Sequence, residues 1–345
     1  MSIHFLRRIA CAAAVVSAAG LLAVQAAIAA TQLTGAGSTF VYPFFSKAFY
    51  AYSSKHPEVT VNYQSIGSGG GIQQFTAKTV DFGASDVPMN ADELKRAGGP
   101  VVQVPVALGG EAIAYNLAAV KNLKLTRQAV VDIFLGKIQK WNDGAIEKLN
   151  PGTSLPDTPI VVVHRSDGSG TTFIFTDFLS HVSGEWKSKV GTGKSVQWPA
   201  SSSIGGKGNE GVAGQIQQTP GAIGYVELAY VIENHMTQAQ LQNSSGKWLT
   251  CTPRTVQDAA ATKPTVSSTD FSIVDRKGAD VWPIAGYTWA MLYAQPTDKA
   301  RARLTHDVLE WTVTDGQAIA ASVDYVPLPT SVQATAKRTL AQIKL

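Results

Sequence analysis

The strongest structural signal in this chain is the run Ile160-Val161-Val162-Val163-His164-Arg165-Ser166-Asp167-Gly168-Ser169-Gly170-Thr171. Its first four residues are continuously apolar, which is typical of a strand buried on both faces of a sheet. A loop of small and hydroxyl residues follows, and residues 173–179 have the pattern of a helix. This order places ligands at the carboxyl end of the strand, where free N–H groups at the helix start favour an anion. The run therefore predicts an α/β fold with an anion site.

Three further loops have the same composition, namely Gly35–Phe40, Gly67–Gly71 and Ala84–Asp86. Small residues let the backbone approach a ligand, and hydroxyl groups donate hydrogen bonds. One such loop is more often a simple turn, but four loops that follow strand-like stretches or open the mature chain favour a shared oxyanion site. Arg165 supplies the cation and Asp86 the carboxylate. We expect Asp167 to form an ion pair with Arg165 and to orient it.

Short strands and helices alternate along the rest of the chain, as expected for an α/β fold. The pattern predicts strands at residues 59–63, 79–84, 113–116 and 288–293, and helices at residues 72–78, 127–135 and 300–313. Asn90 is the expected N-cap of a helix over residues 91–94. Two segments rich in Gly, Pro and Ser, 191–211 and 262–269, are predicted to be loops.

Residues 1–29 have the features of a secretory signal peptide. Arg7 and Arg8 precede an apolar stretch over residues 9–28, and Ala27-Ile28-Ala29 matches a cleavage site, so the mature chain should start at Ala30. The alternative is an uncleaved anchor helix. No other stretch approaches the 18 apolar residues of a membrane span. The remaining length suits two domains.

Charge and cysteine content exclude several classes of protein. Without Arg7 and Arg8 the formal net charge falls from +4 to +2, which is too small to indicate a nucleic-acid or membrane partner. Cys11 leaves with the signal peptide, so Cys251 has no partner for an internal disulfide. We expect Cys251 to be a buried bystander.

Catalytic and metal motifs are not matched in this chain. Gly205-Gly206-Lys207-Gly208 lacks the spacing of a phosphate-binding Walker loop, and residues 168–170 lack that of a nucleophile elbow. The histidines are isolated, so neither a metal site nor a cofactor is expected. A secreted phosphatase that uses Ser169 or Asp86 would need a metal or an activating base, and no spacing supplies one.

The motifs, taken in order, resemble the periplasmic phosphate-binding proteins of Pst-type ABC transporters. The matching stretches are residues 33–40, 61–71, 79–86, 134–141, 165–171, 205–209 and 220–227. The resemblance covers nearly all of residues 31–345 and is weakest over about 235–280.

This resemblance implies a two-lobed periplasmic binding protein fold of type II, with a hinge of two crossing strands. Lobe I would comprise residues 30–107 and 285–345, and lobe II residues 108–284. The two crossings would lie near Val106–Gly110 and Trp282–Gly286.

The resemblance also implies a set of phosphate ligands between the lobes. They are Ser38, Thr39, Phe40 through its backbone N–H, Ser68, Asp86, Arg165, Ser169, Gly170 and Thr171. Asp86 would accept a hydrogen bond from a phosphate O–H group. Sulfate has no such proton, so binding of sulfate, molybdate or tungstate is the less favoured alternative.

The implied function is high-affinity binding of inorganic phosphate in the periplasm, without catalysis. The loaded protein would deliver phosphate to the permease and ATPase subunits of the transporter. The free protein would be a monomer and would have no nucleic-acid partner.

Overall fold

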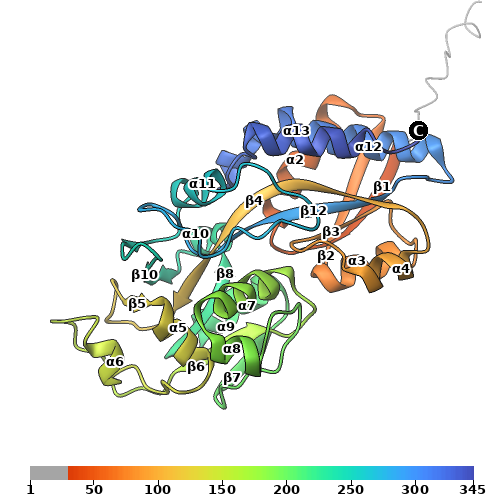
Figure 1. The fold of residues 1–345 in the computed structure, drawn as a ribbon. Helices are drawn as coiled ribbons and strands as arrows, with labels where there is room; N and C mark the ends of the chain where they lie inside the picture. Colours follow the sequence, from red (N-terminus) through yellow and green to blue (C-terminus); the bar gives the residue numbers. More distant parts are fainter. Residues whose placement is uncertain (1–29) are drawn as a thin grey trace, which may run out of the picture.

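The computed structural model describes residues 30–345, which form an elongated α/β structure with two groups of elements along its length (Figure 1). The predicted signal peptide falls on residues 1–29, outside the described residues. Within residues 30–345, no helix has both the length and the apolar character needed to cross a membrane.

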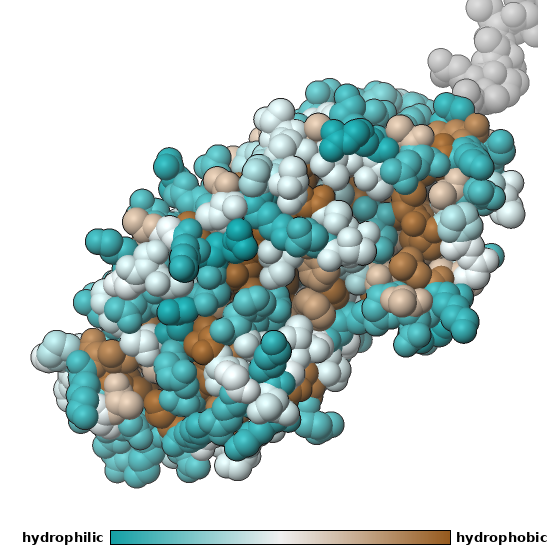
Figure 2. Space-filling model, viewed as in Figure 1, coloured by the Kyte–Doolittle hydropathy of each residue, from teal (hydrophilic) through white to brown (hydrophobic). Residues whose placement is uncertain are grey.

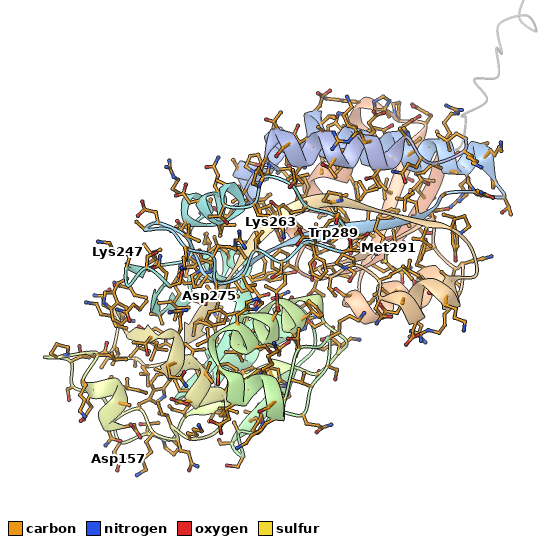
Figure 3. All side chains as sticks on the ribbon, viewed as in Figure 1. Asp157, Lys247, Lys263, Asp275, Trp289 and Met291 are labelled. Carbon is orange, nitrogen blue, oxygen red and sulfur yellow. The ribbon has the colours of Figure 1, made fainter. Side chains whose placement is uncertain are left out.

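Five neighbouring strands of the main sheet belong to the first group. In spatial order they are β2 (Val59–Ser65), β1 (Thr31–Gly37), β3 (Phe82–Ser85), β12 (Ala285–Tyr293) and β4 (Val101–Tyr115). The strands β1, β2 and β3 are parallel, whereas β12 runs antiparallel to β3 and β4. Trp289 and Met291 of β12 point into the buried interior (Figure 3).

Helices cover both faces of these strands (Figure 1). One face carries α2 (Tyr42–Lys55), α12 (Lys299–Val313), the 3-10 helix η1 (Asp315–Val323) and α13 (Thr330–Leu340). The other carries α3 (Ser68–Thr76) and α4 (Ala91–Ala97). Aromatic rings fill the core beneath α2, where Phe45 packs edge-on against Tyr63 and Phe82 at centroid distances of 5.1 and 6.2 Å.

The second group continues the same sheet beyond β4. Its strands are β8 (Ala222–Glu227), β6 (Val161–Arg165) and β7 (Ser203–Gly206), with β9 (Thr237–Gln238) also pairing with β4. Its helices are α5 (Arg127–Phe134), α6 (Gly144–Glu147), α7 (Gly170–Val182), α8 (Gly184–Lys189), α9 (Gly208–Gln218), α10 (Leu228–Glu233) and α11 (Pro253–Ala261). A small separate sheet contains β5 (Lys124–Thr126), β10 (Gln240–Gln242) and β11 (Trp248–Leu249).

Strand β4 belongs to both groups, because it changes its pairing partner partway along. Residues 101–110 pair with β12, and residues 111–115 pair with β8. At the change, the N–H of Glu111 donates to the carbonyl of Ile284 at 2.8 Å. Gly110 packs so closely that an added Cβ would lie 2.8 Å from the Sγ of buried Cys251.

The structure confirms most predicted elements but corrects three of them. The predicted strand over 113–116 is only the end of β4, which begins at Val101. The predicted loop over 191–211 contains β7 and the start of α9. The predicted helix over 72–78 begins earlier, at Ser68, because Gly67 adopts a φ of 83° and lets the chain turn directly into α3. Asn90 caps α4 through a full capping box, as expected.

Polar residues dominate the surface seen in Figure 2, and hydrophobic residues appear there in separate small patches.

Candidate anion-binding site

The predicted loops meet where the two groups of elements face each other. The N–H of Gly69 donates to the carbonyl of Gly168 at 2.7 Å. An added Cβ on Gly170 would lie 2.6 Å from both Asp86 and the Ser68 hydroxyl. All nine predicted ligand residues are buried, and Arg165 is the most exposed of the eight whose exposure is quantified, at 5%. The structure therefore brings the whole predicted set together.

The loop before α2 presents its N–H groups on one side. Three tyrosine hydroxyls donate to three consecutive carbonyls of this loop: Tyr63 to Ser38 at 2.9 Å, Tyr230 to Thr39 at 2.6 Å, and Tyr325 to Phe40. A carbonyl and the N–H of the same peptide unit point in opposite directions. The N–H groups of residues 39–41 therefore face away from the tyrosines, and they donate to no group within residues 30–345. At the start of a helix, this arrangement favours an anion.

Asp86 is the carboxylate of the site, and it is only 2% exposed. Its Oδ1 accepts from Ser38 at 2.5 Å and from Thr288 at 2.7 Å, whereas Oδ2 accepts only a longer bond of 3.3 Å from Ser68. Burial raises the pKa of Asp86 to about 6, although these hydrogen bonds and the Arg165 charge act in the opposite direction. Oδ2 therefore retains capacity for a further donor.

Arg165 lies at the end of β6, and its guanidinium group is held in a fork by Asp167. Nε and Nη2 donate to the two carboxylate oxygens at 2.8 and 2.6 Å. Burial acts to lower the pKa of Arg165, but the hydrogen bond and charge of Asp167 outweigh it and raise the pKa. Nη1 donates to the Thr171 hydroxyl at 3.0 Å. The predicted ion pair is confirmed, and it fixes the plane of the guanidinium group.

The start of α7 lies beside this cation. Ser169 is its N-cap, and the hydroxyl accepts from the N–H of Thr172 at 3.0 Å. Gly170 and Thr171 form the first turn, so their N–H groups have no partner within the helix. A residue with a side chain at Gly170 would collide with Asp86, which explains the glycine at this position.

Two further acids near the site were not predicted from the sequence. Glu111 and Glu227 are fully buried and lie directly opposite each other on β4 and β8. Oε2 of Glu227 accepts from the N–H of Ala229 at 2.8 Å. The Oε1 of Glu227 and both oxygens of Glu111 have no hydrogen-bond partner among the described residues. Burial, followed by the charge of Asp86, raises the pKa of Glu111 well above its ordinary value.

Thr288 and Asn209 also contact the predicted ligands, and neither was predicted as a site residue. Thr288 is a single hydroxyl in β12, and only the pairing of β12 with β3 carries it to Asp86. Asn209 stands in a motif that the sequence already singled out, residues 205–209. The match of this stretch to the family was the available signal, and the contacts of Asn209 with Thr39 and Thr171 are visible only in the structure.

The site is suited to binding a small anion through many neutral donors and one cation. Three loops supply backbone N–H groups, and threonine and serine supply hydroxyls. The carboxylate can accept from a ligand that carries a proton. Ser169 caps a helix and Asp86 is held by three hydroxyls, and within residues 30–345 neither has an activating base among its hydrogen-bond partners.

Comparison with known proteins identifies the family. Residues 24–315 match the model of the PBP superfamily domain. The chain is 47% identical over 302 residues to the phosphate-binding protein PstS of Xylella fastidiosa, covering 86% of this chain and 82% of the relative. It is 45% identical to PstS of Pasteurella multocida, covering 88% of each chain.

Solved structures agree with the fold. A putative phosphate ABC transporter substrate-binding protein from Clostridium perfringens, with bound phosphate, matches with a TM-score of 0.62 and 22% identity, over 86% of this chain and 99% of that one. A phosphate-binding protein from Stenotrophomonas maltophilia matches with a TM-score of 0.70 and 20% identity, over 90% and 94%. The predicted two-lobed binding-protein fold is thereby confirmed, as is the resemblance stated from the motifs. The chain belongs to the PstS family of phosphate-binding proteins, within the PBP superfamily.

Proposed function

We propose that the protein binds inorganic phosphate outside the cytoplasm and delivers it to a Pst-type ABC importer. The observation that carries this proposal is a buried carboxylate, Asp86, surrounded by hydrogen-bond donors and one guanidinium group. The names of the relatives as phosphate-binding proteins support it. Phosphate is only bound and released, so the proposed function requires no chemical step.

The proposed ligands come from both sides of the cleft. They are Ser38, Thr39, the N–H of Phe40, Ser68, Asp86, Arg165, Ser169, Gly170 and Thr171. Phosphate oxygens without a proton accept from the N–H groups, the hydroxyls and Arg165. The phosphate O–H donates to Asp86, whose Oδ2 has spare acceptor capacity.

Asp86 makes the site selective against sulfate. Sulfate carries no proton near neutral pH, so it would leave the carboxylate unpaired and facing an anion. A buried group left without its partner costs about 1–3 kcal/mol, and more when it is charged. Sites that require one hydrogen bond can reject a similar molecule by roughly 10⁴. Arsenate keeps a proton and should compete with phosphate.

We further propose that the lobes close over the ligand about a hinge. Lobe I comprises residues 30–107 and 285–345, and lobe II residues 108–284. The change of partner along β4 at residues 110–111 supports a crossing there, and the contact of Glu111 with Ile284 supports the second crossing beside it. The free protein is proposed to be a monomer.

Residues 1–29 are proposed to direct export and to be removed, which leaves the mature protein in the periplasm. There it would meet the permease and ATPase subunits only when loaded. The arginine pair and the Ala27-Ile28-Ala29 site support this assignment.

Calorimetric titration of residues 30–345 with phosphate, arsenate and sulfate near pH 7 tests the proposal. Phosphate and arsenate should bind, and sulfate should bind at least about 10³-fold more weakly. Asp86→Asn should reduce the difference in affinity between phosphate and sulfate, because the asparagine amide can donate a hydrogen bond to sulfate. Asp157→Asn, at an exposed site in lobe II (Figure 3), is the matched control and should leave both affinities unchanged. Equal affinity of the unaltered protein for phosphate and sulfate would contradict the role of Asp86.

A further inference from the structure

Asn209, at the start of α9, is fully buried and uses all of its polar groups. Its backbone N–H and its Nδ2 both donate to the Thr39 hydroxyl, at 3.1 and 2.9 Å. Nδ2 also donates to the Thr171 hydroxyl at 3.1 Å, and Oδ1 accepts from the N–H of Glu227 at 3.0 Å. One side chain therefore contacts a proposed ligand residue from each lobe.

The direction of these hydrogen bonds follows from the chemistry of the groups. A backbone N–H can only donate, so the amide atom that faces Glu227 must be the oxygen. This fixes the other amide atom as the nitrogen, and each of its two hydrogens points to one threonine. The orientation of the amide is therefore determined by the backbone of β8.

Both threonine hydroxyls are saturated as acceptors. The Thr39 oxygen accepts twice from Asn209. The Thr171 oxygen accepts once from Asn209 and once from Nη1 of Arg165 at 3.0 Å. A hydroxyl has two acceptor lone pairs and one hydrogen, so each of these groups has only its hydrogen left. Neither hydrogen has an acceptor within residues 30–345.

We infer that Asn209 is a positioning residue that turns the hydroxyls of Thr39 and Thr171 into obligatory donors to the bound anion. This inference rests on the proposed function. An isolated threonine hydroxyl can rotate and present a lone pair, which repels an anion. In the closed form the lone pairs are occupied by Asn209 and Arg165, so both hydroxyls present only a hydrogen to the anion.

The same geometry makes Asn209 a link between the lobes. It belongs to the second lobe, and its two bonds to Thr39 form only when the first lobe is close. Closure and hydroxyl orientation therefore occur together, so an anion meets both donors only in the closed form.

Two substitutions of Asn209 distinguish its effect on the orientation of the threonine hydroxyls from the effect of its size. Asn209→Ala removes the three side-chain hydrogen bonds, and the Kd for phosphate should rise at least about tenfold. Asn209→Asp keeps the size but replaces the donor with an acceptor, which draws both hydroxyl hydrogens away from the ligand. Its Kd should therefore rise more than that of the alanine variant. The measurement is calorimetric titration with inorganic phosphate up to millimolar concentration.

A double-mutant comparison tests whether Asn209 acts through the hydroxyls. In Thr171→Val and Thr39→Val proteins one oriented hydroxyl is already missing, so Asn209→Ala should raise the Kd by a clearly smaller factor than in the unaltered protein. An equal factor in both backgrounds would overturn the inference and assign Asn209 a purely structural role. Asn209→Asp binding as well as the unaltered protein would overturn it too.

Asn243 provides the matched control. It is also buried, at 2% exposure, and its amide makes several hydrogen bonds far from the site, to the carbonyls of Gly278 and Ala279 among others. Asn243→Ala should lower the melting temperature and leave the Kd unchanged. If the unaltered protein does not bind phosphate, the proposed function fails. If it binds and Asn209→Ala binds equally well, only the inference fails.

Discussion

Asp86 combines three hydroxyl donors with a pKa raised by burial to about 6. In the arrangement described here it therefore binds a proton more strongly than in the unfolded chain, where the ordinary pKa is 3.8. The stabilisation from this proton is fully present below about pH 3.8 and is lost as the pH rises through about 6.

This gives a first prediction for the ligand-free protein. The melting temperature of the unaltered protein minus that of Asp86→Asn should fall as the pH rises from about 4 to about 7, because only the unaltered protein loses the proton. Thermal unfolding in phosphate-free buffers across this range measures the difference. A difference that is constant over the range would show that Asp86 does not titrate there.

Glu111 leads to a second prediction, that its substitution increases the stability of the folded protein. Its carboxyl group is fully buried without a hydrogen-bond partner, beside the equally buried Glu227. A buried polar group without a hydrogen-bond partner costs about 1–3 kcal/mol, and an apolar residue removes this cost. Glu111→Val should therefore raise the free energy of unfolding, measured by urea denaturation.

The effect of Glu111→Val should also depend on pH. Because the pKa of Glu111 is raised in the folded state, Glu111 destabilises the fold more strongly as the pH rises above the ordinary pKa of a glutamate. The increase in the free energy of unfolding caused by Glu111→Val should therefore be larger at about pH 8 than at about pH 5. Glu111→Gln retains a buried polar group of the same size and serves as the comparison. A destabilised Glu111→Val protein at both pH values would indicate that the buried acid has a partner.

At the residue scale, sequence predicts ligands that lie in composite motifs and misses those that stand alone. Arg165 and Asp86 are recognisable because loops of small residues surround them. Thr288 is one hydroxyl in an apolar strand, and Glu111 is one acid after two glycines. Their roles arise from the pairing of strands that are far apart in the sequence, β12 with β3 and β4 with β8, and no local pattern encodes that pairing.

At the scale of elements, α7 joins stability and binding in one residue. Ser169 caps this helix and is also a proposed ligand. Ser169→Ala should lower the stability by about 1 kcal/mol and also weaken phosphate binding. Ser183 caps α8 in the same way, by accepting from the N–H of Trp186 at 3.2 Å, and is not a proposed ligand.

The pair of variants makes the prediction specific. Ser183→Ala should lose similar stability and keep its affinity for phosphate, as judged by thermal unfolding and titration of both proteins. Equal affinities for the two variants would remove Ser169 from the set of ligands.

Sequence was most reliable for elements with a strong pattern of their own. The helices α5 and α12 and the strands β2 and β6 were predicted to within a few residues, because apolar periodicity or a continuous apolar run marks each of them. The segment 191–211 was wrongly predicted as loop because β7 has only four residues, mostly exposed or half-buried, and depends on pairing with β6. The full length of β4 was also missed, since two glycines interrupt its pattern.

For the whole molecule, an ion pair between Glu93 of the first group and Lys194 of the second joins the two groups, with side chains only 9% and 19% exposed. We expect it to favour the closed form without touching the ligand. A partly screened pair of this kind contributes about 1 kcal/mol, so Lys194→Ala should raise the Kd for phosphate roughly fivefold.

Small-angle scattering follows closure through the radius of gyration, independently of phosphate affinity. Phosphate should reduce the radius of gyration of the unaltered protein, and Lys194→Ala should need a higher phosphate concentration for the same change. Lys140→Ala removes an exposed ion pair with Asp157 within the second group and should behave like the unaltered protein. Binding with an unchanged radius would argue for a preformed site without a hinge.

Cys251, which packs against Gly110, can be used as a chemical probe of local opening. Its thiol is buried where β4 changes partner, so a thiol reagent can reach it only after this junction opens. When the junction opens and closes faster than the reagent reacts, the labelling rate is the population of opened molecules multiplied by the reactivity of the free thiol. Saturating phosphate should slow labelling in proportion to the ligand excess over Kd if opening requires release of the ligand. Because residues 30–345 contain no second cysteine, this one residue reports the opening of the junction without any engineered probe.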